Sequence, residues 1–567
     1  MSLIKILEEK IIEIFKNESY DVDNISLNLN SKKELGQFQI NDCIRLAKKR
    51  GENPLKLAEK ICSLLNETNF FKNCNATNPG FVNINIKDDI LIKYLNDCLD
   101  NIEINIDKHK SETIIIDYGG ANVAKELHVG HLRAANIGQA LYNLSKVLGH
   151  NVISDVHLGD IGSQAGKTIY EIEILYPHLP YFAKDYDGNI DFPFEITEKD
   201  LAILYPKGSQ RSKEDELAKE KMDEITSLIQ KGHIGYKTLW NRIVELSSKK
   251  IKESYASINV HFDLWNGELM THKFIPQMIE ELKKTGIVYL DDGAQIIDTT
   301  ENIPPLILVK SDGSYLYSTT DLATIYNRVK NTNVNKLWYV VDKRQALHFK
   351  QVFIASKKLG LTENIELKHI GFGTMNSKDG KPFKTRDGGV LSLESLINEV
   401  KDVIREKTKN LDNKETLVNI ISIGALKYAD LTSIVSTDYI FDVDKFTSIE
   451  GKTGPYIMYN SVRIKSLIDK ANIGKLEIEN IENKDLYDLI SQIIIMPKIF
   501  NSAFDKGTLH ELCDYVYKIN SLYSSFYSNN RILDSKNKKT LVSISKLVLK
   551  INTFIFKVLG IVIPDEM

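Results

Sequence analysis

The fold is decided by residues 113–156, whose sequence is TIIIDYGGANVAKELHVGHLRAANIGQALYNLSKVLGHNVISDV. Residues 113–117 are a short β-branched run that ends at a pair of glycines, and such a run predicts a buried strand. Apolar residues then recur at three- and four-residue steps across 132–148, which is the spacing of a helix face. Gly149 ends this helix, and residues 152–156 predict a second strand. The order strand, loop, helix, strand is typical of a parallel α/β sheet.

Two histidines stand at the start of the predicted helix. His128 and His131 follow the loop, so they lie near the carboxyl end of the first strand and at the helix N-terminus. Free backbone N–H groups and the partial positive charge of the helix make this position an anion site. Imidazoles donate hydrogen bonds to phosphate oxygens, and Gly130 between them allows a ligand to lie against the backbone. The pattern favours nucleotide phosphate chemistry.

Two other interpretations of the histidine pair stay open. The rings could simply cap backbone N–H groups at the helix start. They could also bind zinc, but zinc requires further Cys, His or carboxylate ligands and none clusters nearby. The chain has five cysteines, and these show no C-x-x-C spacing: Cys43, Cys62, Cys74, Cys98 and Cys513. We therefore predict no metal site in the protein itself.

The string from Ala121 to His131, ANVAKELHVGH, resembles the HIGH motif of class I aminoacyl-tRNA synthetases. Within it, the Asn-x-x-Lys pattern of Asn122 and Lys125 resembles the arginyl-tRNA synthetase branch in particular. The resemblance implies an α/β fold whose catalytic domain is a Rossmann-like, doubly wound parallel sheet. It also implies ATP-dependent activation of L-arginine to arginyl-adenylate with release of pyrophosphate, and then transfer of arginine to the 3′-terminal adenosine of tRNA(Arg) with release of AMP.

The resemblance covers nearly the whole chain and divides it into three parts. Residues 1–86 take the place of an N-terminal α/β domain that contacts tRNA, although from the residues alone they are equally a structural spacer. Residues 110–430 take the place of the catalytic domain, interrupted near 175–250 by a charged, helical stretch that looks like an insertion. Residues 431–567 take the place of an all-α anticodon-binding bundle, and the GKTGPY string at 451–456 resembles the one that opens its helices.

Aromatic residues are dense in one helical region of this last part. Most aromatic residues at helical spacing belong to a core, but exposed ones stack on unpaired RNA bases. We expect the majority of the following set in the core and a few on the anticodon: Tyr515, Tyr517, Tyr523, Phe526 and Tyr527.

A glycine-rich loop at residues 375–388 is the second chemical element. It carries four cations within nine residues, which repel one another unless an anion is present; a solvated surface loop is the alternative. The loop resembles the KMSKS loop that closes over ATP, and this implies that Lys381 or Lys384 contacts ATP. The position of the second KMSKS lysine falls on Thr385, and Lys125 is the candidate substitute for the missing charge.

The third element is residues 312–321, where the pattern D-G-x-x-L-Y-x-T-x-D also resembles the arginyl branch. Tyr317 and Asp321 lie one helical turn apart, and a carboxylate accepts two N–H groups of a guanidinium side by side. The alternative is purely structural: Thr319 or Thr320 caps a helix and Asp321 lies in its first turn.

The resemblance assigns a role to each candidate residue. Catalytic stabilisation of phosphate charge is assigned to His128, His131, Lys125, Lys381 and Lys384. ATP binding is assigned to Ala121, Asn122, Val123, Gly130, His128 and His131. Binding of the substrate arginine is assigned to Asp117, Asn122, Tyr317, Asp321 and Gln345.

Composition is compatible with this assignment. At 567 residues and 43% apolar residues the chain is long enough for several packed domains, and its net charge of −3 restricts RNA binding to local patches. No apolar run approaches a membrane span and the N-terminus lacks a signal-peptide layout, so we expect a cytoplasmic protein without membrane contact. We expect a monomer whose partners are tRNA(Arg), L-arginine and ATP, with Mg²⁺ arriving with ATP.

Two rival functions are alternatives to arginylation. A nucleotidyltransferase of the same superfamily shares the H-x-G-H unit but has no use for a 117-residue helical C-terminal module. A non-catalytic RNA-binding paralogue keeps the RNA modules but loses cleft residues, whereas this chain has both histidines, Tyr317 and Asp321. Pyrophosphate exchange with ATP discriminates among the three.

Overall fold

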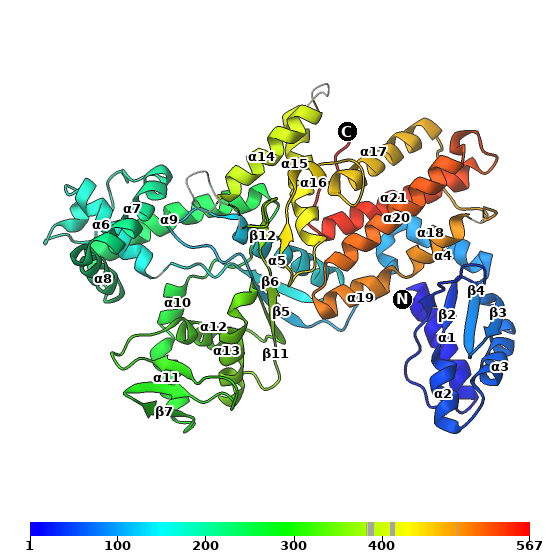
Figure 1. The fold of residues 1–567 in the computed structure, drawn as a ribbon, viewed down its shortest axis with the longest axis horizontal. Helices are drawn as coiled ribbons and strands as arrows, with labels where there is room; N and C mark the ends of the chain where they lie inside the picture. The colour runs from blue at the N-terminus through cyan, green and yellow to red at the C-terminus, as the bar shows by residue number, and fades with distance from the viewer. Residues whose placement is uncertain (161, 382, 384–390, 409–413, 484) are drawn as a thin grey trace.

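The computed structural model describes residues 1–160, 162–381, 383, 391–408, 414–483 and 485–567. Figure 1 shows three parts along the chain: a small N-terminal part in blue, a central part built around a sheet, and a group of helices toward the C-terminus in orange and red.

The N-terminal part is a four-stranded antiparallel sheet with helices, and its strand order is β1-β2-β4-β3. Asn53 caps one of these helices by accepting the N–H groups of two residues, and Pro54 follows at the first helical position, where no N–H is needed. Its elements are α1 (Leu3–Asn17), β1 (Asn28–Leu29), β2 (Phe38–Ile40), α2 (Asp42–Arg50), α3 (Pro54–Asn66), β3 (Phe71–Thr77), β4 (Phe81–Ile86) and α4 (Asp88–Asp100).

The central sheet has four parallel strands in the order β11-β10-β5-β6. They are β5 (Thr113–Asp117), β6 (Asn151–Asp155), β10 (Lys336–Asp342) and β11 (Glu366–Phe372). The first predicted strand is confirmed as β5, and the second begins at Asn151, one residue earlier than predicted. Because the strands are parallel, their carboxyl ends meet at one edge, where ligands bind in folds of this type.

Helix α5 (Val129–Val147) connects β5 to β6 and is confirmed as predicted. It packs closely on the chain that leaves β5: a Cβ added at Gly138 would lie 2.1 Å from Cγ of Tyr118. Apolar residues of the strand and the helix, such as Ile116 and Leu141, are fully buried and belong to one core cluster. This packing fixes the start of α5, and with it the histidine pair, above the carboxyl end of β5.

The rest of the central part is mainly helical, with a three-stranded antiparallel sheet of order β7-β8-β9. Figure 1 shows α6 to α8 at the far end of the molecule from the N-terminal part. The stretch predicted as a helical insertion near 175–250 contains α7, α8 and most of α9, and its limits remain a prediction. The elements are α6 (Ser163–Leu175), α7 (Glu198–Glu214), α8 (Glu216–Gln230), α9 (Ile234–Ser257), α10 (Glu268–His272), α11 (Ile275–Lys283), β7 (Val288–Asp291), β8 (Ala294–Ile297), β9 (Leu306–Val309), α12 (Tyr317–Asn331), η3 (Lys343–Gln345), α13 (Ala346–Lys358), β12 (Met375–Asn376), α14 (Leu393–Lys407), α15 (Lys414–Leu431), β13 (Tyr439–Ile440) and α16 (Val443–Phe446).

The C-terminal part is helical and begins at the predicted GKTGPY string. Thr453 caps α17: its hydroxyl accepts the N–H of Tyr456 (3.1 Å) and donates to the carbonyl of Ser448 (2.6 Å). A Cβ at Gly454 would lie 2.7 Å from the carbonyl of Gly424, so α17 packs against α15 at backbone distance. The helices are α17 (Gly454–Ala471), α18 (Asp485–Ile494), α19 (Met496–Lys506), α20 (His510–Asn529) and α21 (Lys538–Val558).

The N-terminal and C-terminal parts contact each other directly. The Asn96 amide donates to the carbonyl of Ile478 (2.9 Å) and accepts its N–H (2.8 Å), and the Asn105 amide donates to the carbonyl of Ile493 (2.7 Å). Figure 1 shows α4 beside α18 and α21. Within the described residues, every helix is too short or too polar for a passage through a bilayer.

Candidate active site

The two predicted histidines form the N-terminal cap of α5. The N–H of Gly130 donates to Nδ1 of His128 (3.0 Å), and the N–H of His128 donates to Nδ1 of His131 (3.0 Å). The ring centroids lie 3.9 Å apart. Because an accepting Nδ1 carries no proton, each neutral ring is protonated on Nε2. The capping interpretation therefore holds, and it also orients the donor Nε2–H of half-buried His128 away from the helix backbone.

Both rings stay neutral near pH 7. Burial lowers the pKa of His128, and the charge of Lys125 adds to the effect. Burial lowers the pKa of His131 to about 3, assisted by His128 and Lys125, while hydrogen bonding to the backbone of Gly120 acts in the opposite direction. A Cβ at Gly130 would lie 2.8 Å from Cε1 of His128, so this residue has to be glycine for the ring to take its place. The pair thus consists of uncharged donors at the positive end of a helix.

The loop before the histidines is fixed to the chain that follows β6. The N–H of Val123 donates to the carbonyl of Gly159 (3.0 Å), and the N–H of Gly159 donates to the carbonyl of Ala121 (2.9 Å). The side chain of Asn122 lies on the same glycine, because a Cβ at Gly159 would come within 2.4 Å of its Oδ1. The three predicted ATP-loop residues therefore stand beside the ends of both β5 and β6.

Lys125, the predicted substitute cation, lies between the histidines and the helices of the central part. Its Nζ is 4.7 Å from the centre of the Tyr205 ring on α7, and its charge lowers the pKa values of both histidines. It also lines a cavity of about 290 Å³ together with residues of α9 and α14. The structure brings Lys125 into electrostatic range of the histidine pair.

The described beginning of the predicted lysine loop is held by ion pairs and by its own backbone. Lys378 pairs with Asp442 (3.1 Å) and Asp444 (2.9 Å). The N–H of Ser377 donates to the carbonyl of Lys381 (2.9 Å), so residues 377–381 form a closed turn in which Lys381 is exposed.

Two further residues of this loop carry predictions. Lys384, the alternative ATP-contacting cation, and Thr385, the position of the missing ammonium, both lie outside the described residues.

Asp117 lies at the carboxyl end of β5, as predicted, but one of its oxygens already has a partner. Nη2 of Arg328 donates to Oδ2 of Asp117 (2.6 Å) and to Oδ2 of Asp155 (2.8 Å), and all three side chains are buried. Burial outweighs Arg328 at Asp117 and raises its pKa, whereas Arg328 outweighs burial at Asp155 and lowers its pKa. Sequence reasoning missed Asp155. It is the last residue of β6, and because the carboxyl ends of parallel strands meet at one edge, its position could have been predicted from the sequence.

Tyr317 and Asp321 lie one turn apart on α12, and the structural alternative is confirmed for the cap but wrong for Asp321. The helix begins at Tyr317, and Thr319, its third residue, accepts the N–H of Leu316 (3.3 Å) in a capping-box arrangement. Thr319 also donates to the carbonyl of Leu308 (2.6 Å), a contact with β9 that fixes the helix start. Asp321 therefore falls beyond the first turn, where a role toward the helix dipole is weak.

The two side chains of this pair differ in exposure. Tyr317 is 71% exposed, whereas Asp321 is half-buried. Oδ2 of Asp321 lies 2.5 Å from Nε2 of His348 on α13. Gln345, the third predicted arginine-binding residue, is exposed at the end of η3, directly after β10. Because β10 adjoins β5 in the sheet, these residues and the histidine pair lie at the carboxyl edge of neighbouring strands.

Glu268 is a candidate that sequence reasoning missed, and no motif marks it. It opens α10, and the adjacent Leu269 N–H donates to Oδ1 of Asp160 (2.8 Å). Burial raises the pKa of Glu268 to about 8, with further contributions from the carboxylates of Asp321 and Asp160. A cationic ligand, such as a guanidinium, stabilises the ionised form of a carboxyl group that is held among other carboxylates.

Comparison with known proteins identifies the family. The model for the class I (R) tRNA synthetase catalytic domain matches residues 95–443, that for the DALR anticodon binding domain matches 457–567, and that for the arginyl tRNA synthetase N-terminal domain matches 1–86. An arginine–tRNA ligase of Alkaliphilus oremlandii is 39% identical over 584 residues and covers 100% of both chains. The chain belongs to the arginyl-tRNA synthetase family. A second arginine–tRNA ligase, from Agathobacter rectalis, is 39% identical over 596 residues, again with 100% of both chains covered.

Solved arginyl-tRNA synthetases have the same fold. The enzyme from Plasmodium falciparum superposes with a TM-score of 0.84 at 24% identity, covering 100% of this chain and 99% of its own. The enzyme from Thermus thermophilus superposes with a TM-score of 0.81 at 19% identity, covering 100% of both chains. The predicted arrangement is confirmed: a Rossmann-like catalytic sheet, a small N-terminal α/β part and a helical C-terminal part.

Membership of the arginyl-tRNA synthetase family makes the chain a ligase that uses ATP, as predicted. The described residues contain no group of three or more His, Cys, Asp or Glu side chains arranged to hold a metal ion.

Proposed function

We propose that this chain joins L-arginine to the 3′-terminal adenosine of tRNA(Arg) in two steps. The arginine carboxylate attacks the α-phosphorus of ATP, and the bond to pyrophosphate breaks. A ribose hydroxyl of the tRNA then attacks the carbonyl of the adenylate, and AMP leaves. The observation that carries the proposal is the placement of a neutral histidine pair and an anionic pocket at the carboxyl ends of two adjacent strands, β5 and β10.

The arginine pocket is proposed to consist of Tyr317, Asp321 and Gln345 from the sequence prediction, with Glu268 added. Asp321 and Glu268 supply two negative charges for one guanidinium, and charge-assisted hydrogen bonds are about twice as strong as neutral ones. Tyr317 offers an aromatic face to the cation. Because Glu268 titrates near pH 8 without ligand, the bound guanidinium favours its ionised form and releases a proton.

The α-groups of arginine are assigned to Asp117 and Asn122. Asp117 keeps Oδ1 available when Arg328 holds Oδ2, and its burial strengthens any contact with the α-ammonium. Asn122 is fixed on Gly159, from where its amide reaches the same edge of the sheet. The single positive charge of Arg328 offsets one of the two strand-end carboxylate charges, which reduces the net negative charge near Asp117 that ATP meets.

The ATP site is proposed at the start of α5. His128, oriented by its Nδ1 contact, directs Nε2–H toward the phosphates, and His131 fixes that orientation by accepting the backbone N–H of His128. Uncharged donors at a helix N-terminus stabilise charge that develops on phosphate without a reorganisation of the site. Lys125 and the loop lysines Lys381 and Lys384 are proposed to supply the positive charge.

The loop 121–123 and Gly130 are proposed to face the adenosine and the α-phosphate with backbone groups. Mg²⁺ is proposed to arrive on the phosphates of ATP, where it neutralises part of their charge. Of the carboxylates at this edge, Asp117 and Asp155 share Arg328, which leaves them poorly suited as ligands of a resident ion.

We propose that the tRNA contacts residues 1–86 and residues 431–567. These two parts flank the proposed catalytic domain, residues 110–430. Of the aromatic cluster on α20, Tyr515, Tyr523 and Phe526 are buried in the core, as expected for the majority. Tyr517 and Tyr527 are half-buried, and the guanidinium of Arg463 lies 4.0 Å over the Tyr527 ring. These rings are the ones proposed to stack on anticodon bases. A monomeric state and a cytoplasmic location are proposed as well; five free, buried cysteines suit a reducing compartment.

Pyrophosphate exchange with ATP tests the proposal. The purified full chain is incubated with each of the twenty amino acids in turn, with and without total tRNA. We expect exchange with arginine alone among them, and transfer of labelled arginine to tRNA. Exchange without amino-acid selectivity would indicate a different nucleotidyl transfer, and RNA binding without any exchange would indicate a non-catalytic RNA-binding protein.

A further inference from the structure

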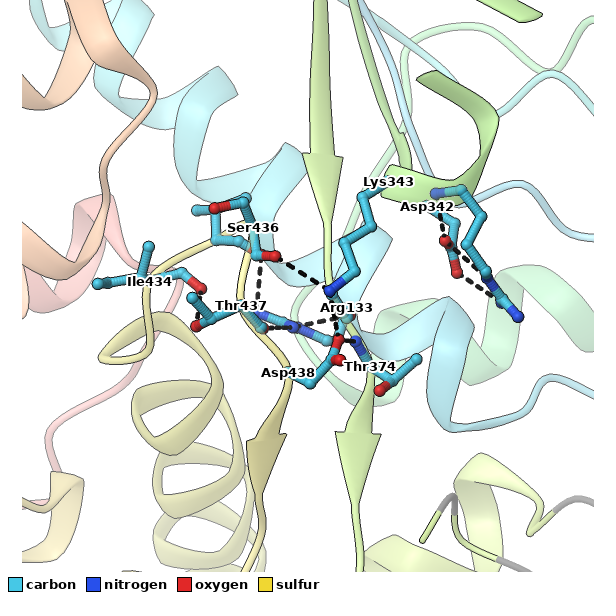
Figure 2. A network of polar contacts seen from close by, with 11 residues as sticks. Arg133, Asp342, Lys343, Thr374, Ile434, Ser436, Thr437 and Asp438 are labelled. Atoms are coloured by element: carbon cyan, nitrogen blue, oxygen red, sulfur yellow. Dashed lines mark hydrogen bonds and ion pairs between the residues drawn. The ribbon is translucent and has the colours of Figure 1, made fainter. Parts of the chain in front are cut away.

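The segment between α15 and α16 lies between the proposed arginine pocket and the lysine turn at residues 377–381. Figure 2 shows its central residue, Asp438, pointing at the ammonium of Lys343 on one side and the backbone of Thr374 on the other. Oδ1 of Asp438 accepts the N–H of Thr374 (2.7 Å) and Nζ of Lys343 (2.8 Å). These two contacts lower the pKa of Asp438 to about 2. One carboxylate oxygen therefore joins two segments that are far apart in sequence.

The first segment continues into the lysine turn. Thr374 directly precedes β12, which pairs with β13: the N–H of Tyr439 donates to the carbonyl of Thr374 (3.0 Å), and the N–H of Phe441 donates to that of Asn376 (2.8 Å). The turn that follows is closed by its own hydrogen bonds. The position of Thr374 therefore sets the position of the whole turn.

The second segment continues into the arginine pocket. Lys343 opens η3, two residues before Gln345, and the same stretch leads into α13, where His348 contacts Asp321. Gln345 ends η3 and His348 follows it on α13, so a ligand that contacts Gln345 and Asp321 acts directly on this stretch. The ammonium of Lys343 joins the same stretch to Asp438.

A buried arginine, Arg133, holds the segments that carry Thr374 and Asp438 in place. Arg133, on α5 two residues after His131, is 1% exposed and donates to Asp430 (2.8 Å), to the carbonyl of Gly373 (2.7 Å) and to that of Thr437 (3.0 Å). Figure 2 shows its guanidinium between the segments that carry Thr374 and Asp438 and lead into β12 and β13. Helix α5, which begins at the histidine pair, is thus hydrogen-bonded to both segments. Lys343, which contacts Asp438, is exposed to solvent.

We propose that Asp438 is a positioning residue for adenylate formation, which links η3 of the arginine pocket to the lysine turn so that bound arginine sets the place of Lys378 and Lys381. This inference rests on the proposed function. The link couples the two substrates: arginine strengthens ATP binding, and by thermodynamic reciprocity ATP strengthens arginine binding to the same degree.

The exposure of the ion pair separates this role from a structural one. The side chains of Lys343 and Asp438 are 41% and 48% exposed, and ion pairs this exposed contribute little to folding stability. Asp438→Asn keeps an oxygen for the N–H of Thr374 and removes only the charge. Lys343→Met keeps most of the side-chain volume and removes the ammonium. We therefore expect both variants to fold as the unchanged protein does.

The test measures ATP affinity by calorimetry on the full chain with tRNA, in the absence and presence of L-argininol. Argininol has the guanidinium and the α-ammonium but no carboxylate, so no adenylate forms. In the unchanged protein we expect argininol to tighten ATP binding about fivefold or more, a typical coupling. In Lys343→Met and in Asp438→Asn this factor falls close to one. The double variant is no worse than either single variant, because both remove the same link.

Two further variants control the result. Lys284→Met removes an ammonium of another exposed ion pair, with Glu280 at 3.1 Å on the far helix α11, and keeps the full coupling. Lys343→Arg, which retains the charge and the reach, restores it. The proposal is overturned if the unchanged protein shows no coupling although it binds argininol, or if Lys343→Met retains the coupling. Failure of the unchanged protein to bind argininol at all would instead reject the proposed function.

Discussion

The pH dependence of arginine binding is the sharpest consequence of the site, and Glu268→Gln is the change that exposes it. Burial and the neighbouring carboxylates of Asp321 and Asp160 raise the pKa of Glu268 to about 8. The free site is therefore mainly protonated at pH 7, whereas a bound guanidinium requires the carboxylate. The affinity for arginine therefore rises as the pH rises through 8, and then levels off.

The size of the effect follows from the fraction ionised. With a pKa near 8, about one site in eleven is ionised at pH 7 and one in two at pH 8, so the arginine KM falls about fivefold between them. The side-chain amide of the Glu268→Gln variant cannot titrate, and the KM of this variant should show no such fall. At pH 8.5, where the lost charge matters most, we expect the KM of the variant to exceed that of the unchanged protein by about tenfold.

The assay is pyrophosphate exchange at saturating ATP and tRNA, from pH 6.5 to 8.5. Arginine's own α-amino group titrates identically with both proteins, so the ratio of the two KM values isolates Glu268. Calorimetry in two buffers of different ionisation enthalpy adds the number of protons released on arginine binding. The reasoning is refuted if the KM ratio stays constant with pH, or if Glu268→Gln still releases a proton.

The remaining predictions concern the two histidines, the lysine beside them and the selectivity of the pocket. Replacing His128 by Ala should lower the rate of adenylate formation by about 100-fold, on the order of 3 kcal/mol, while arginine binding barely changes; a near-normal single-turnover rate would contradict the ATP assignment. The pKa of His131 in the folded protein is about 3, below its unfolded value near 6.5, so folding stability is lost as pH falls below about 6.5. The Tm of the unchanged protein should therefore fall more between pH 7 and pH 5 than the Tm of His131→Gln. Equal shifts in calorimetric scans would show that the ring does not stay neutral. Lys125→Ala should lower the activation rate as strongly as loss of the loop lysines, and the double change with Thr385→Lys should recover part of it; normal turnover of Lys125→Ala in exchange assays would assign the charge to another group. Asp321→Asn should raise the arginine KM strongly and leave the ATP KM nearly unchanged, and the unchanged protein should reject citrulline, whose neutral ureido end leaves the half-buried carboxylates without a cationic partner; activation of citrulline as readily as arginine would remove the arginine assignment.

The sequence by itself determined the features that lie within one unit of chain. The β5–α5–β6 unit followed from the β-branched run, the helical spacing of apolar residues and the terminating glycine, because strand and helix periodicities are local. The histidine pair at the helix start was determined in the same way, since cap and helix are adjacent in sequence. The family followed from motifs that are short and continuous.

Only the tertiary structure decided which side chains from separate elements meet. Glu268 joins Asp321 because α10 packs beside α12, and its raised pKa is a property of that burial and not of its neighbours in sequence. Thr319 takes part in the N-terminal cap of α12 as the third helical residue, and its contact with β9 fixes the helix start at Tyr317, so Asp321 lies beyond the first turn. Asp117 was predicted as an open ligand, but Arg328, more than two hundred residues further on, occupies one of its oxygens. Such contacts depend on the order of strands in the parallel sheet and on the packing of helices across it, and the composition of a single segment does not encode them.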